Sequence, residues 1–142
     1  MKYLIAVVLL FPIGVVAQVR PFFGGGLGHL NNAAIEMKAG VMVDNVVLEA
    51  ATAFSSVVPF QHSVKLGYNF GEKWYAIPSA GAAFYTFAQE DKERNYTKFA
   101  VGLEAGRRID LWGTYGGDVF SSADIHISYF GKWFGVGMKM VF

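Results

Sequence analysis

The sequence contains no cysteine and few charged residues. The absence of cysteine excludes disulfides, thiolate metal sites, cysteine nucleophiles and a lipid-modified N-terminal cysteine. Charged residues make up 16% of the 142 positions, against about 25% in an average soluble domain. Apolar residues reach 54%, more than the core of one small domain can bury. Some apolar surface should therefore face lipid or a partner.

Beyond its N-terminal segment, the chain also lacks an uninterrupted apolar run of about 20 residues, the length that a membrane-spanning helix needs. Residues 1–17 have the layout of a signal peptide, with Lys2, an apolar centre and a small-residue cleavage site at Ala17. The alternative is a transmembrane anchor, but Pro12 and Gly14 interrupt the run. Cleavage before Gln18 leaves residues 18–142 as one domain.

The mature chain has no excess of either charge. Removal of Lys2 leaves 11 basic residues against 11 acidic ones. No basic patch is present that would favour nucleic acid as a partner.

Large apolar side chains recur at every second position in most of the mature chain, the period of a β-strand. Gly131-Lys132 and Asp44-Asn45 have the composition of tight turns between such segments. The dense charge cluster at 89–95 is typical of a solvated hairpin tip. The expected strands cover residues 18–29, 33–43, 46–54, 60–70, 74–88, 96–107, 111–120, 124–130 and 134–142.

Nine segments are one too many for a bacterial membrane barrel, which normally has an even number of strands. Either 111–119 is largely a connection, or 124–142 is one long bulged strand. We favour eight strands, with a final hairpin that turns at Gly131-Lys132. The expected fold class is all-β: a single antiparallel up-and-down transmembrane β-barrel with an interior just wide enough to be filled by side chains.

The charged residues of these segments fall on one face, and the opposite face is apolar. The faces of 74–88 cannot be assigned, because Pro78 and Gly81 interrupt a weak alternation. Lipid disfavours outward charges, and a barrel interior can pair them. A soluble sandwich with the faces reversed is the alternative. The expected interior charge network consists of Glu36, Lys38, Glu49, Lys65, Lys98, Glu104 and Lys139.

The last nine residues alternate most clearly. Every second side chain from Phe134 to Phe142 is large and apolar, and the chain ends on an aromatic residue. This segment resembles the closing strand of small bacterial outer-membrane β-barrel proteins, with Gly137, Met140 and Phe142 matching the C-terminal signal. The resemblance implies a location in the outer membrane, contact with its lipid, recognition of this strand by the barrel-assembly machinery, and a monomer.

Asp124, His126 and Ser128 alternate and therefore share a face. The His126-Ile127-Ser128 segment resembles that of outer-membrane lipid A deacylases, which implies a serine hydrolase with His126 as base. Tyr129 stands where that family has an asparagine, and no glutamate follows Glu104. Polar lining of the barrel interior is the preferred interpretation. The other histidines, His29 and His62, lie on separate segments, so no metal site and no cofactor are expected.

The expected function is that of a non-enzymatic outer-membrane barrel with a structural, surface-interaction or porin-like role. Two alternatives stay open at this stage. One is a lipid hydrolase that uses His126 and Ser128. The other is a secreted soluble β-barrel that binds a small apolar ligand.

Overall fold

Alternation of large and small side chains produces eight strands that close into one barrel. The computed structural model describes residues 18–30, 32–55, 60–89, 92–111 and 119–142. The expected signal peptide at 1–17 lies outside the described residues. No helix in the described part of the chain is long and apolar enough to cross a membrane. The strands are β1 (Val19–His29), β2 (Ala33–Val43), β3 (Val46–Ser55), β4 (Phe60–Tyr68), β5 (Trp74–Gln89), β6 (Lys92–Asp110), β7 (Ser122–Phe130) and β8 (Trp133–Val141).

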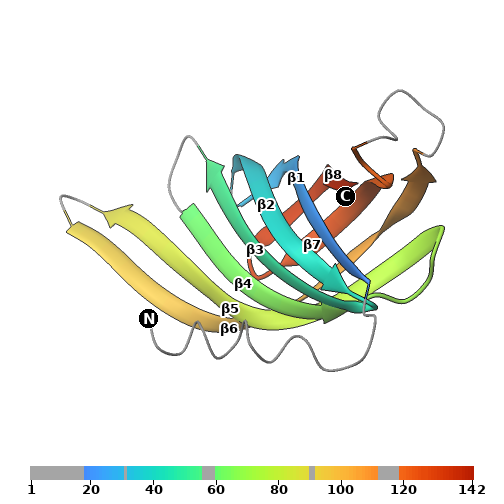
Figure 1. The fold of residues 1–142 in the computed structure, drawn as a ribbon. Helices are drawn as coiled ribbons and strands as arrows, with labels where there is room; N and C mark the ends of the chain where they lie inside the picture. The colour runs from blue at the N-terminus through green and yellow to red at the C-terminus, as the bar shows by residue number, and fades with distance from the viewer. Residues whose placement is uncertain (1–17, 31, 56–59, 90–91, 112–118) are drawn as a thin grey trace.

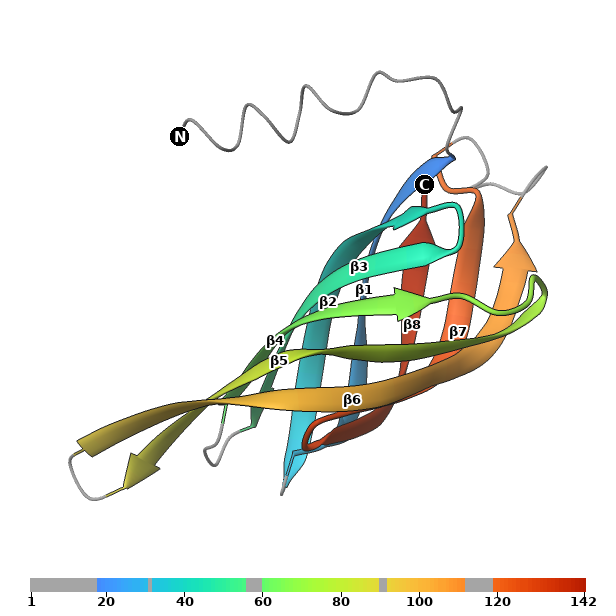
Figure 2. The ribbon, with the colours of Figure 1, turned by 90° about the horizontal axis from the view of Figure 1, so that it is seen from below.

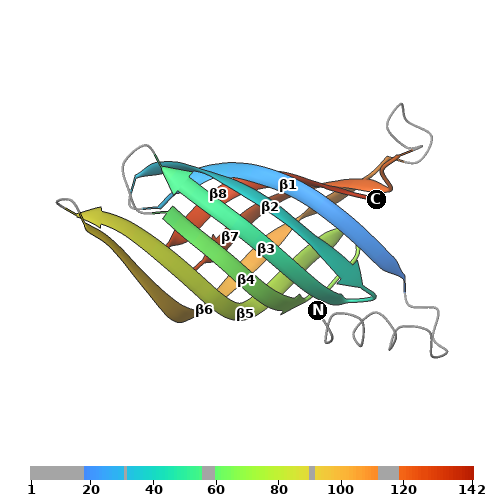
Figure 3. The ribbon, with the colours of Figure 1, turned by 60° about the vertical axis from the view of Figure 1, so that its left-hand side comes forward.

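Each strand pairs antiparallel with its neighbours in the chain, and β8 closes the barrel against β1. The wall is strongly tilted, and the strands wrap around the axis (Figures 1 and 3). This is the all-β up-and-down barrel expected from the sequence. The final hairpin turns at Gly131-Lys132, where Gly131 adopts a positive φ of 62°. That conformation favours glycine.

The expected ninth strand is absent from the described residues of its segment. Leu111 and Phe120 are not in strands, and 112–118 lie outside the described residues. The segment therefore connects β6 to β7, and Asp124 belongs to β7 rather than to one long bulged strand. β6 is longer than expected, because it begins at Lys92, inside the charge cluster.

The outer wall is apolar between two rings of aromatic side chains. One ring lies at the end of the barrel where β1 begins and β8 ends, which is called the termini end below. It contains Phe23, Phe120 and Phe142, whose rings contact one another, with Tyr68, Phe70 and Trp74 further round. The ring at the other end lies beside the connections there and contains Phe60, Phe84, Phe99, Tyr129 and Phe134. Such paired girdles flank the lipid-facing band of membrane barrels.

The interior has three layers. On β2, β3 and β8, the inward row passes from one apolar cluster through charged side chains to a second apolar cluster. The cluster at the termini end contains Phe22, Met42, Val47, Tyr75, Ile77 and Val141. Two clusters lie toward the other end: Leu30, Ala34, Ala53 and Trp133, and Ala83, Tyr85, Ala100 and Phe130. The charged layer is thus enclosed between apolar layers.

The hairpin of β5 and β6 extends well beyond the other strands at the end away from the termini (Figure 2). β5 pairs with β6 from Trp74 to Gln89, but β6 pairs with β7 only from Gly102 to Asp110. The first part of β6 therefore has β5 as its strand neighbour on one side and, among the described residues, no strand on the other.

Candidate functional site in the barrel interior

Glu104 of β6 is the centre of the charged layer. Its side chain is 3% exposed. Lys38 donates a hydrogen bond to Oε2 at 2.8 Å, and Tyr75 donates one to Oε1 at 3.1 Å. Lys139 also donates to Oε1. A buried carboxylate is stable only when it is paired and hydrogen-bonded, and Glu104 meets both conditions.

A second set of pairs extends the layer across the barrel. Lys65 Nζ lies 2.8 Å from Glu49 Oε1, and Lys38 Nζ lies 3.5 Å from Glu36 Oε1. Lys139 lies over the rings of Phe22 and Tyr75, 5.0 and 5.1 Å from their centroids. Six of the seven residues assigned to the interior from the sequence are buried here: Glu36, Lys38, Glu49, Lys65, Glu104 and Lys139.

Lys98 is the exception, and its assignment to the interior network was wrong. It lies on the inward row of β6, between Tyr96 and Ala100, but it is exposed. The reason is that β7 does not reach this part of β6, so the inner face is open here. Its ammonium lies 5.3 Å from the centroid of the Tyr96 ring.

Arg108 and Asp124 form a further pair, nearer the termini. They are direct partners across β6 and β7, and three hydrogen bonds of 3.0, 3.3 and 2.9 Å join the guanidinium to the carboxylate. Ser122 donates a further hydrogen bond to Asp124 at 3.3 Å. The pair was missed because the expected strand ended at Arg107, one residue before Arg108, whereas β6 continues to Asp110.

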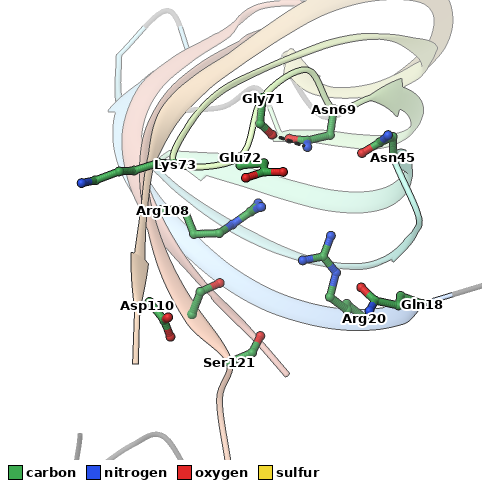
Figure 4. A pocket seen from close by; sticks show the side chains of 11 residues that line it. Gln18, Arg20, Asn45, Asn69, Gly71, Glu72, Lys73, Arg108, Asp110 and Ser121 are labelled. Atoms are coloured by element: carbon green, nitrogen blue, oxygen red, sulfur yellow. Dashed lines mark hydrogen bonds between the residues drawn. The ribbon is translucent and has the colours of Figure 1, made fainter. Parts of the chain in front are cut away.

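The opening at the termini end is a polar cavity of about 700 Å³. The guanidinium groups of Arg20 and Arg108 project into it, and Lys73 points away (Figure 4). Asn69 is buried and donates a hydrogen bond to the Gly71 carbonyl at 2.9 Å. Arg20, which lines the cavity, also lies 3.2 Å from the sulfur of Met42, a member of the apolar cluster around Phe22. By contrast, the cavity beside Glu49 and Lys65 in the charged layer measures only about 10 Å³.

His126 and Ser128 share the inward face of β7, as the sequence predicted, and both are buried. No hydrogen bond joins them in the described structure. Ser128 Oγ instead accepts a hydrogen bond from Trp133 Nε1 at 3.0 Å. His126 Nε2 lies 3.8 Å from Glu104 Oε2, and neither ring nitrogen has a hydrogen-bond partner among the described residues. The arrangement lacks the base-to-nucleophile contact that a serine hydrolase needs.

The three histidines do not converge on a metal site. Among the described residues, no group of three histidine, aspartate or glutamate side chains could hold a metal ion. His62 lies on the outer wall, where its Nδ1 is 3.0 Å from Thr52 Oγ1.

The C-terminal signal residues occupy different environments. Phe142 is exposed on the outer wall, and its backbone N–H donates to the Pro21 carbonyl at 2.9 Å. Met140 is half-buried on the same face. Gly137 faces inward, where an added Cβ would lie 2.6 Å from the Gly25 carbonyl oxygen and 2.9 Å from His126 Nε2. The glycine is therefore required by the close approach of β1 and β7.

Comparison with solved structures identifies the class of fold. The chain is similar to the N-terminal β-barrel domain of Pseudomonas aeruginosa OprF, with 18% identity, a TM-score of 0.58, and coverage of 89% of this chain and 98% of that one. It is also similar to a de novo designed transmembrane β-barrel, with 13% identity, a TM-score of 0.56, and coverage of 91% and 98%. The fold is thus that of eight-stranded transmembrane β-barrels. No protein-family model and no curated protein matches the sequence.

Proposed function

We propose that this protein is a small, non-enzymatic β-barrel of a bacterial outer membrane, with a structural or surface-interaction role. The distribution of polarity carries the proposal. On the outer wall, Leu27 is 66% exposed and Val136 is 56% exposed, whereas Glu104 and Lys139 inside are 3% and 0% exposed. A soluble barrel has the reverse arrangement, with its charges in water and its apolar side chains inside.

The closed interior favours a structural or surface-interaction role over that of an open porin. Paired charges and two apolar layers fill the space that a wide pore would need, as is usual for eight strands. The interior also disfavours the binding of a small apolar ligand, because the middle of the barrel is filled with charged side chains. The hydrolase is not favoured, since Ser128 Oγ is engaged by Trp133 and both Ser128 and His126 point away from lipid.

Detergent dependence tests the membrane assignment. The protein refolded in detergent micelles should migrate faster on an unheated gel than after boiling, because a closed barrel resists the denaturing detergent. It should aggregate once the micelles are removed. A monomer in plain buffer, with identical mobility before and after boiling, would refute the proposal.

Orientation and assembly follow from the outer-membrane assignment. The end that carries the termini would face the periplasm, and the β5–β6 hairpin would stand on the outer side. The barrel-assembly machinery would recognise β8 through its outward row, which ends at Phe142.

Phe142→Ala should then reduce insertion into the outer membrane of cells, while Phe120→Ala in the same aromatic ring should not. Equal insertion of both variants would refute recognition through Phe142.

A further inference from the structure

The free edge of β6 has the geometry of a docking site. Residues 94–101 pair with β5 on one side, and no described strand pairs with them on the other. In a strand, half of the backbone N–H and C=O groups point to each side, so no described strand pairs with the groups of this edge that point away from β5. The hairpin carries this edge away from the rest of the barrel (Figure 2).

The part of this edge before Phe99 lies beyond the lipid-facing band. Phe99 is 77% exposed on the outer row of β6 and belongs to the aromatic ring away from the termini. Asn95 and Thr97 lie on the same row, nearer to the tip of the hairpin, and both are polar and exposed. The apolar wall therefore ends at Phe99, and the strand beyond it is in contact with water.

The inward row of the same segment is basic. Arg94 and Lys98 are both exposed, lie four positions apart and flank Tyr96. Neither has an ion-pair partner among the described residues. The ring of Tyr96 stacks on Tyr85 of β5, with centroids 5.0 Å apart, and forms the aromatic centre of this face.

The two bases decide which occupant the edge can accept. A second copy of the chain would bring its own Arg94 and Lys98 to the same face, and like charges across strands are destabilising. A strand with acidic side chains opposite Arg94 and Lys98 would instead form two favourable cross-strand pairs. Charge thus disfavours self-association and favours an acidic partner.

We propose that the free edge of β6 binds an extended acidic segment of a partner protein, which adds to the sheet as a further strand. The segment carries acidic residues four positions apart, with a small or apolar side chain midway that faces Tyr96. The two acids stand at equal distances from the middle residue, so both can face Arg94 and Lys98 whether the segment runs parallel or antiparallel to β6. The proposal rests on the proposed function, because the edge must stand outside the membrane to meet a partner.

A peptide titration tests this inference. The probe is the synthetic peptide Thr-Glu-Thr-Val-Thr-Glu-Thr, whose two acids and valine share one face of a strand. Its matched control, Thr-Glu-Thr-Val-Glu-Thr-Thr, has the same composition with the acids on opposite faces. The full mature barrel in micelles is first checked for faster migration on an unheated gel. A barrel that does not migrate faster on the unheated gel counts against the membrane assignment and not against the docking site.

On the folded barrel, the first peptide should slow amide hydrogen exchange at residues 94–101 in NMR spectra, and the control should bind at least about fivefold more weakly. Lys98→Glu should weaken binding of the first peptide by about five- to tenfold. Lys73→Glu, at the opposite end of the barrel, should leave it unchanged. Equal binding of the two peptides, no protection at 94–101, or a dimer of the barrel through this edge would each overturn the proposal.

Discussion

Lys38 of β2 and Glu104 of β6 join opposite walls of the barrel, with 2.8 Å between Nζ and Oε2. In a closed order of eight strands, β2 and β6 are four strands apart in either direction. Glu104 also binds Lys139 of β8 and Tyr75 of β5. One carboxylate therefore holds together four strands that are distributed around the wall.

Glu104→Ala should lower the free energy of unfolding by about 3 to 5 kcal/mol, because it leaves two buried ammonium groups without their main partner. Urea unfolding of the protein refolded in lipid vesicles, followed by tryptophan fluorescence, measures this loss.

Lys139→Ala and the double variant with Glu104→Ala complete a mutant cycle. The losses in the free energy of unfolding from the two single variants should not add. The loss in the double variant should fall short of their sum by about 0.5 to 3 kcal/mol, as for residues in one network. Strict additivity would mean that Glu104 and Lys139 stabilise the barrel independently.

The faces of the interior residues were predictable from the sequence, but their partners were not. The period of two is a local property, so alternation alone placed Glu104 and Lys139 on the inner row. The contact between Lys38 and Glu104 depends on the register of four strand pairs, which no local pattern contains. Tyr75 was missed because small residues, Pro78 and Gly81 blur the alternation around it.

The prediction for Lys98 failed for a related reason. The inner row of a strand is enclosed only where the opposite wall covers it. The length of the β5–β6 hairpin beyond β7 therefore decides whether Lys98 is buried. That difference in length depends on where β7 ends, and the alternation within β6 carries no information about it.

Gly137→Ala should destabilise the barrel by about 1 to 3 kcal/mol through overpacking. The new Cβ would lie 2.6 Å from the Gly25 carbonyl oxygen, which belongs to β1 and can move only with its strand. The urea midpoint in vesicles reports the change. An unchanged midpoint would show that β1 and β8 can separate locally at no cost.

Ser128→Ala should cost about 1 to 3 kcal/mol, because it leaves the buried indole N–H of Trp133 without its acceptor. We expect no acyl release from lipopolysaccharide by the wild type or by this variant, assayed by mass spectrometry of the lipid products. Release by the wild type that disappears in Ser128→Ala would instead make His126 a general base.

Val136→Arg should destabilise the barrel by about 2 kcal/mol, because Val136 lies on the lipid-facing row inside the apolar band, although nearer to the ring of Phe134 than to that of Phe142. At a vertical rise of about 2.3 Å per residue of tilted strand, Val136 stands about 14 Å above Phe142. Phe142 and Phe134 belong to opposite aromatic rings, and Val136 lies between them on β8.

Thr97→Arg is the matched control, since it adds the same charge to the outer row of β6 beyond Phe99. It should cost at most about 1 kcal/mol. Urea titration of both variants in the same vesicles measures the contrast. If both variants unfolded at the wild-type urea concentration, the wall around Val136 would not be in contact with lipid, and the membrane assignment would lose its physical basis.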